Sequence, residues 1–234
     1  MAFLHTNKDF RAAREDFSTP TEKTLAGLFD FGLNKVRFIA VNGPNQECEV
    51  SLTVVNTENK TVLECDDIHG DDYGLLIRPQ MNLIYVKEVR AINNNGDCRR
   101  NGLGKAFIAG LVRVAETVGI DNINLTAGRE DGMYFWSRHG WRLLDDQQAG
   151  KFCNDINRKL ETAGHEHFSD DQIDVIRKLI HRQDLYVNQR LAELPLTQEQ
   201  INFLFAGEIR MGLNLKDDRC LKRLKQGLDR GMIR

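Results

Sequence analysis

The sequence contains little proline and only a scattered, odd set of cysteines. There are 4 Pro and 5 Cys in 234 residues, and no two cysteines form a CxxC pair. This pattern favours neither a disulfide framework nor a zinc site. Low proline together with 28% charged and 41% hydrophobic residues is typical of an ordinary globular protein and not of a disordered chain.

Long hydrophobic runs and an excess of one charge sign are also missing. No run approaches the length of a membrane span, and the first residues, MAFLHTNKDFRAARED, lack the basic-then-apolar order of a secretory signal. We therefore expect a cytoplasmic protein without membrane association. The formal net charge is −2, so the chain as a whole has no electrostatic preference for nucleic acid or anionic membranes.

The composition changes near residue 145. Before it, four segments have the short β-rich pattern of strands, and NTENKT, between the second and third, predicts a hairpin turn; the segments are 35–42, 47–57, 61–68 and 81–92. After it, we expect helices only. SDDQIDVIRKLIHR begins with a Ser cap, and TQEQINFLFAGEIRMG has Gln200 three residues after Thr197, as in a capping box, and would end near Gly212. The sequence thus predicts an α/β domain over 1–145 and a helical domain over 146–234.

The segment GDCRRNGLGKAF, residues 96–107, lies between a predicted strand and a predicted helix. It matches neither a P-loop nor a dinucleotide-binding fingerprint, because Arg99, Ala106 and Phe107 stand where those motifs need other residues. A helix beginning near Gly102 would still direct backbone N–H groups and its positive dipole end at an anion, and a pyrophosphate would fit. The alternative is a glycine-rich turn with two solvated arginines. Helical spacing is seen in the apolar residues Leu103, Phe107, Leu111, Val114 and Val118.

The spacing Arg99-x-x-Gly102-x-Gly104 resembles the Q/R-x-x-G-x-G/A loop of the GNAT superfamily of acyl-CoA-dependent N-acyltransferases. The next segments agree: IDNINLTAG (120–128) is a predicted strand, and DGMYFWSRHGW (131–141) is similar to the fourth helix of that family and its FYxxxGF ending. The resemblance covers roughly residues 35–145. It implies an α/β fold with a mixed central sheet and flanking helices, to which this chain adds an all-helical C-terminal extension.

The resemblance implies acetyl-CoA as the acyl donor. Backbone amides of the loop would hold its pyrophosphate, the main chain of the preceding strand would pair with its pantetheine arm, and Trp136 would lie beside it. The residues concerned are Val89, Arg90, Ala91, Ile92, Arg99, Arg100, Asn101, Gly102, Leu103, Gly104 and Lys105.

Acyl transfer to an amine requires removal of a proton, because an alkylamine with a pKa of about 10.4 is mostly charged at neutral pH. Glu88 is the candidate base, since strand alternation places it on one face with Ile84 and Val86, and apolar neighbours raise a carboxyl pKa. Histone-acetylating members of the family resemble this arrangement. The alternative is that Glu88 only pairs with Arg90 on the same face.

Many family members use a tyrosine as the acid that protonates the leaving thiolate, and Trp136 stands at that position. An indole N–H cannot release its proton in this pH range, so Tyr134 and Ser137 are the nearby substitutes. A thiolate with a pKa near 8.5 also leaves readily without an acid. Core packing is the alternative role for the aromatic residues of this segment.

Two charged segments are candidates for substrate or partner binding. ECDDIHGDDYG would attract a cationic acceptor through Asp66, Asp67, Asp71 and Asp72, unless it is only a solvated loop. The locally basic segment from Lys216 to Arg234 would bind RNA phosphates or an acidic partner, unless it is a solvated helix face. HEH (165–167) does not predict a metal site, because residues two apart do not share a helix face.

The leading interpretation is an acetyl-CoA-dependent N-acetyltransferase that acts on an amine of a protein, an aminoacyl-RNA or a small molecule. The apolar helix around Ile201–Phe205 must pack against the α/β domain, a second copy of the chain or a target macromolecule, so a homodimer is one possibility. The alternative function is a non-catalytic interaction protein of the same fold, whose helical tail binds a protein or nucleic acid.

Overall fold

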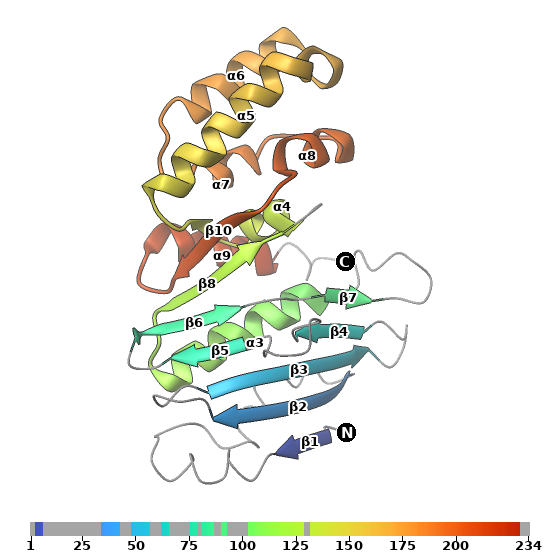
Figure 1. The fold of residues 1–234 in the computed structure, drawn as a ribbon, viewed down its shortest axis with the longest axis vertical. Coiled ribbons are helices and arrows are strands. Elements are labelled where there is room, and N and C mark those ends of the chain that lie inside the picture. Colours follow the sequence, from blue (N-terminus) through green and yellow to red (C-terminus); the bar gives the residue numbers. More distant parts are fainter. Residues whose placement is uncertain are drawn as a thin grey trace. The chain divides into compact units, whose positions relative to one another are not determined.

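The computed structural model describes residues 3–6, 34–42, 48–56, 62–65, 75–78, 81–86, 90–92, 103–128 and 132–229. The chain forms an α/β structure with C-terminal helices (Figure 1), and it divides into two compact units, Met1–Ile123 and Asn124–Arg234. The described helices include none with the length and apolar character needed to cross a membrane.

The first unit contains a mixed sheet in the order β1-β2-β3-β5-β6. β1 is parallel to β2, and the pairs β2–β3, β3–β5 and β5–β6 are antiparallel. Two further strands extend it, since β4 pairs with β3 and β7 pairs with β4. The strands are β1 (Phe3–Thr6), β2 (Asn34–Asn42), β3 (Cys48–Asn56), β4 (Val62–Cys65), β5 (Leu75–Arg78), β6 (Leu83–Val86) and β7 (Arg90–Ile92).

The strand predicted over 81–92 is divided between β6 and β7, which have different partners. One half of β3 pairs with β5 and the other half with β4, and these two shorter strands in turn pair with β6 and β7. Among the described strands, β7 pairs with β4 alone. The other edge of β7 therefore has no partner strand in the described part of the chain.

Helix α3 (Leu103–Val118) and strand β8 (Asn122–Ala127) follow, close to their predicted positions. The predicted helical spacing is confirmed by the burial of Phe107, Leu111 and Val114. The loops that precede β6 and β8 are joined by Asn82, whose backbone is left-handed with φ 52°. Its side chain donates to Asp121 Oδ2 (3.0 Å) and accepts from Asp121 N (2.6 Å).

The second unit contains the remaining elements, and in it β10 lies between β8 and β9. β10 is antiparallel to β9, with Met211 opposite Leu143 and Gly212 opposite Arg142. The elements are α4 (Gly132–Arg138), β9 (Arg142–Leu143), α5 (Asp146–His167), α6 (Asp170–Ile180), α7 (Val187–Leu191), α8 (Gln198–Phe205), β10 (Ile209–Asn214) and α9 (Asp218–Asp229).

The sequence predicts an all-helical C-terminal part, and this prediction is wrong, because the part also contains strand β10. The predicted capping boxes are confirmed at Ser169 for α6 and Thr197 for α8, but α8 ends at Phe205 and not near Gly212. The next residues form β10, which buries Ile209, Met211 and Leu213 at every second position. The alternation of buried residues in β10 and its pairing with β9 outweigh the helical pattern of the preceding residues.

The composition change near residue 145 coincides with the start of α5 at Asp146 and not with the boundary between compact units, which falls within β8. Elements on both sides of residue 145 share one unit, because β9 pairs with β10 and α4 contacts α7, α8 and α9. The change in composition therefore marks the start of the mainly helical segment, whereas the boundary between the compact units depends on contacts between elements.

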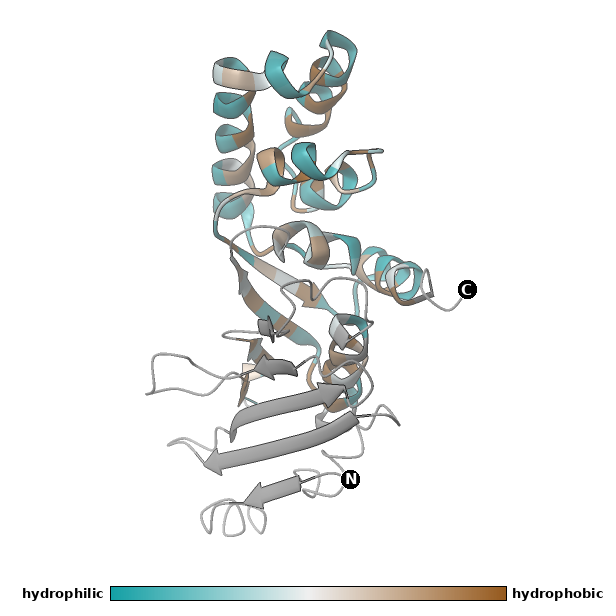
Figure 2. Ribbon diagram, turned by 90° about the vertical axis from the view of Figure 1, so that its right-hand side faces the viewer, coloured by the Kyte–Doolittle hydropathy of each residue, from teal (hydrophilic) through white to brown (hydrophobic). Residues whose placement is uncertain are grey.

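Helix α8 packs against helices of its own chain. Its residues Ile201, Leu204 and Phe205 are buried, and α8 contacts α4 and α5. The Phe205 ring lies 5.3 Å from that of Tyr134 and 6.2 Å from that of Phe152. Figure 2 shows polar and apolar residues alternating along the C-terminal helices, as expected of amphipathic helices with one buried side.

The turn between α4 and β9 makes a close contact with α9. Gly140 has φ 99°, and a Cβ atom there would lie 2.6 Å from Cys220 O and 3.1 Å from Leu224 N. A Cβ at Gly227 would lie 2.8 Å from Arg138 O. Both positions therefore require glycine for the backbones to approach.

We expect Gly140→Ala to lower the free energy of unfolding by about 3 kcal/mol or more, because backbone strain adds to steric overlap. Gly207→Ala is the matched control: Gly207 has φ 134°, and nothing lies within 4 Å of its added Cβ. The control should cost about 1–2 kcal/mol from strain alone. Urea unfolding of both variants measures the difference, and equal losses would contradict the close contact with α9.

Candidate functional site

Several predicted site residues lie outside the described part of the chain. They are Glu88, Val89, Arg99, Arg100, Asn101 and Gly102 of the predicted catalytic and cofactor site, and Asp66, Asp67, Asp71 and Asp72 of the acidic segment. The flanking elements are described. Arg90, Ala91 and Ile92 form β7, and Leu103, Gly104 and Lys105 form the start of α3.

The start of α3 has the electrostatic character that an anion site needs. The first N–H groups of a helix have no partner within the helix, and its dipole places partial positive charge there. The first turn of α3 contains no acidic residue and includes Lys105. The residues present therefore fit a phosphate group at this end of the helix.

Helix α4 carries the three other predicted site residues. Trp136 is 9% exposed, and its ring lies 4.9 Å from that of Trp141 and 5.1 Å from that of Phe135. This indole is thus part of the hydrophobic core of its unit. Tyr134 is only half-buried, and its hydroxyl accepts a hydrogen bond from Arg138 Nη1 (3.4 Å).

Ser137 has a structural role in the described unit. Its side chain is buried, with 1% exposed, and its hydroxyl donates to Met133 O (2.7 Å). The same hydroxyl accepts a hydrogen bond from Asn188 Nδ2 (2.8 Å). These contacts engage the hydroxyl in holding α4, which leaves Tyr134 as the more accessible of the two acid candidates.

Helix α7 anchors the end of α4 through polar groups that sequence analysis did not single out. Asn188, fully buried, donates from the same amide nitrogen to Ser137 Oγ and to Trp141 O (2.9 Å). Gln189 Nε2 donates to Gly140 O (2.9 Å), and Arg138 Nη1 donates to Ala192 O (2.9 Å). The sequence gives no clear signal for them, because Asn188 and Gln189 stand in a short, mostly polar helix, VNQRL, where such residues are usually exposed.

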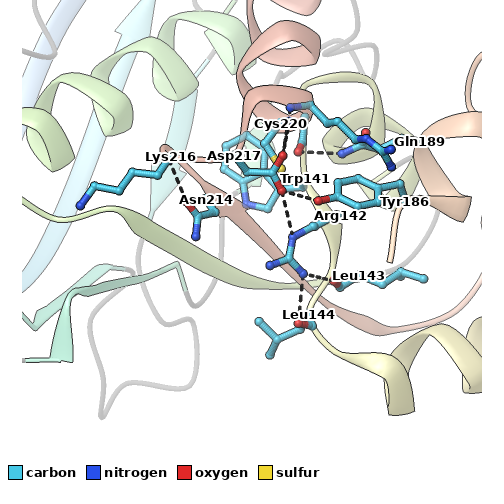
Figure 3. A network of polar contacts seen from close by, with 12 residues as sticks. Trp141, Arg142, Leu143, Leu144, Tyr186, Gln189, Asn214, Lys216, Asp217 and Cys220 are labelled. Atoms are coloured by element: carbon cyan, nitrogen blue, oxygen red, sulfur yellow. Dashed lines mark hydrogen bonds and ion pairs between the residues drawn. The ribbon is translucent and has the colours of Figure 1, made fainter. Parts of the chain in front are cut away.

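A second polar network joins β9, α7 and the start of α9 (Figure 3). Tyr186, just before α7, donates from its hydroxyl to Asp217 Oδ2, and Arg142 Nε lies 3.7 Å from the same oxygen. Asp217 Oδ1 accepts from the backbone N–H of Arg219 (2.9 Å) and Cys220 (3.3 Å). Asp217 thus caps α9 while binding Tyr186 and Arg142.

The environment of this network changes the proton affinity of its members. Burial and the hydrogen bond to Asp217 raise the pKa of Tyr186 to about 12. Burial opposes ionisation of Asp217, but hydrogen bonds from Tyr186 and from the backbone outweigh it and lower the pKa of the carboxyl. Burial raises the pKa of the Cys220 thiol to about 11, so this cysteine is a poor nucleophile at neutral pH.

Cys153 and the two histidines of HEH do not form a catalytic or metal cluster. Burial, and then the charge of Asp184, raise the pKa of Cys153 to about 11. His165 Nδ1 lies 3.1 Å from Asp170 Oδ1, whereas His167 Nδ1 lies 3.0 Å from Glu199 Oε1. Within the described ranges, no three His, Cys, Asp or Glu side chains are grouped as metal ligands.

Comparison of this chain with protein-family models, curated proteins and solved structures gave no match.

The raised pKa of Tyr186 predicts a stability change at alkaline pH. Because the folded-state pKa lies above the value near 10 of an unfolded tyrosine, the neutral phenol stabilises the fold below pH 10. That contribution is lost as the pH rises from about 10 towards 12. We expect the stability difference between wild type and Tyr186→Phe to shrink between pH 10 and about 12 in denaturant unfolding.

Asp217→Asn tests the cause, because it removes the carboxylate that accepts the Tyr186 hydrogen bond and raises the pKa of the phenol. In the Asp217→Asn background, the stability change caused by Tyr186→Phe should depend less on pH. A pH-independent difference for Tyr186→Phe would show that the phenol is not held by Asp217.

Proposed function

We propose that this protein is an acetyl-CoA-dependent N-acetyltransferase of the GNAT type. The order of described elements carries the proposal: β6 and β7, then α3, β8, α4 and the Gly140-Trp141 turn follow one another as the sequence resemblance implies. In the sequence, the predicted loop motif runs from the segment after β7 into the first turn of α3, with Arg99, Gly102 and Gly104 at the spacing of the family loop.

The donor would bind at two features of the first unit. The second edge of β7, which has no partner among the described strands, would offer main-chain groups of Arg90, Ala91 and Ile92 to the amides of a pantetheine arm. The start of α3, free of acidic residues in its first turn, would hold the diphosphate through backbone N–H groups.

In this mechanism Glu88 accepts a proton from the acceptor ammonium, directly or through water. The neutral nitrogen attacks the thioester carbonyl carbon, a C–N bond forms, and the C–S bond breaks as the electron pair leaves with sulfur. Tyr134, half-buried on α4, is the candidate donor of a proton to the thiolate. A thiolate with a pKa near 8.5 also leaves without such help, so this contribution is modest.

Trp136 favours a second candidate function. It occupies the position at which many family members carry the acid, and it is packed in the core with 9% of its surface exposed. An interaction protein that keeps the fold, and with it the ability to hold coenzyme A, would have no need of that acid. Its helical C-terminal part would then bind a protein or a nucleic acid.

Two measurements on the full chain separate these functions. Calorimetry with coenzyme A tests the site, and transfer of labelled acetyl groups to a panel of amines tests the chemistry. We expect Glu88→Gln to bind coenzyme A as wild type does but to lose about 10²-fold or more of the transfer rate, since general base catalysis contributes that much. The loss should be largest at low pH, where the ammonium is most populated.

Glu161→Gln is the control, because Glu161 is exposed on α5 and its change removes the same charge. It should leave both measurements unchanged. Binding of coenzyme A without transfer to any amine would favour the interaction protein, and absence of binding by folded protein would overturn both functions.

A further inference from the structure

Helix α9 has two chemically different faces. Cys220 and Leu224 are buried on one of them, four residues apart. Arg219, Lys222 and Lys225 are all exposed and follow one another at intervals of three residues. With a rise of 1.5 Å per residue, successive members of this basic stripe are spaced about 4.5 Å along the helix axis.

The charges of the basic stripe are largely not neutralised by neighbours. Lys222 and Lys225 form no ion pair among the described residues, whereas Arg223, on the same helix, pairs with Glu193. The Arg219 guanidinium lies over the Tyr186 ring, 5.0 Å from its centroid. One exposed carboxylate, Asp218, stands in the first turn, where the helix dipole favours it.

The composition of the stripe indicates what it would bind. Proteins that bind single-stranded nucleic acids stack the bases on exposed aromatic rings, and the stripe contains no such ring. A regular row of cations fits the regular row of phosphates of a duplex better. The ring of Tyr186, which Arg219 contacts, is already covered by two cations, since the guanidinium groups of Arg219 and Arg142 lie 5.0 and 6.0 Å from its centroid. Double-stranded DNA presents one phosphate charge per about 1.7 Å of its axis, so several phosphates lie within the length of about 9 Å that the stripe covers.

We propose that the basic stripe of α9 docks the phosphate backbone of double-stranded DNA. The major groove of B-form DNA, about 12 Å wide, admits a helix ridge between two lines of phosphates, whereas the corresponding groove of A-form RNA is too narrow for side chains to enter. The contacts are to phosphates, so binding is independent of base sequence. This function does not depend on acyl transfer.

Fluorescence anisotropy of a labelled DNA duplex with the full chain tests the proposal over a series of salt concentrations. Three phosphate contacts predict a slope of log K against log salt of about −2.7, because each contact contributes about −0.9. In the double variant Lys222→Ala/Lys225→Ala the slope should flatten by about 1.8, with a corresponding loss of affinity at low salt.

Lys151→Ala/Lys178→Ala is the matched control, since both lysines are exposed on α5 and α6 of the same unit and the net charge changes equally. It should keep the wild-type slope. The proposal is overturned if both double variants behave alike, or if an RNA duplex of the same sequence, a single strand or a polyglutamate chain competes as well as the DNA duplex. Circular dichroism of each variant checks that the helices are intact.

Discussion

The fully buried amide of Asn188 is the constraint on which the second unit depends most. Through one amide nitrogen it binds the hydroxyl of Ser137 and the carbonyl of Trp141, so that α7 holds both the last turn of α4 and the start of β9. Buried polar groups of this kind stabilise a structure only when their partners are in place, and leaving one unpaired costs about 1–3 kcal/mol. Asn188 therefore specifies one arrangement of α4, β9 and α7.

This constraint links the C-terminal helices to the proposed chemistry. α4 carries Tyr134, the candidate acid, and Trp136, which packs in the core beside Trp141. The turn that follows α4 is held from two sides, by Gln189 at Gly140 O and by the close approach of α9 to Gly140. The C-terminal segments thus complete the unit that contains α4, in addition to any role in choosing a partner.

Much of the local structure could be predicted from the sequence, because local rules specify it. The spacing of Phe107, Leu111 and Val114 identified α3, and Ser169 and Thr197 identified the starts of α6 and α8. Strand β10 was missed: the alternation of Ile209, Met211 and Leu213 is a strand signal, but it directly follows a helical pattern, and pairing with β9 and the position beside β8 favour the strand. Tertiary contacts outweigh propensity in such short segments.

The candidate site, too, could be predicted only in part from the sequence. A loop motif can be recognised from residue spacing, so the expected cofactor residues were defined by the sequence alone. The hydrogen bonds of Asn188 and the network of Tyr186 with Asp217 join residues 31 to 51 positions apart, and no local pattern indicates them. They also give Ser137, one of the two candidate acids, a structural role in its helix.

Hydrogen exchange of the full chain tests the role of Asn188 most directly, with Asn154→Ala, an exposed position on α5, as the control. In Asn188→Ala, the amides of Trp141 and Leu143, which donate to Trp136 O and Leu185 O, should exchange at least about 5-fold faster, since a loss of 1 kcal/mol corresponds to that factor. Amides in α6 should change much less. Unchanged exchange at Trp141 and Leu143, or an equal increase throughout α5 and α6, would contradict the claim that Asn188 fixes the turn between α4 and β9.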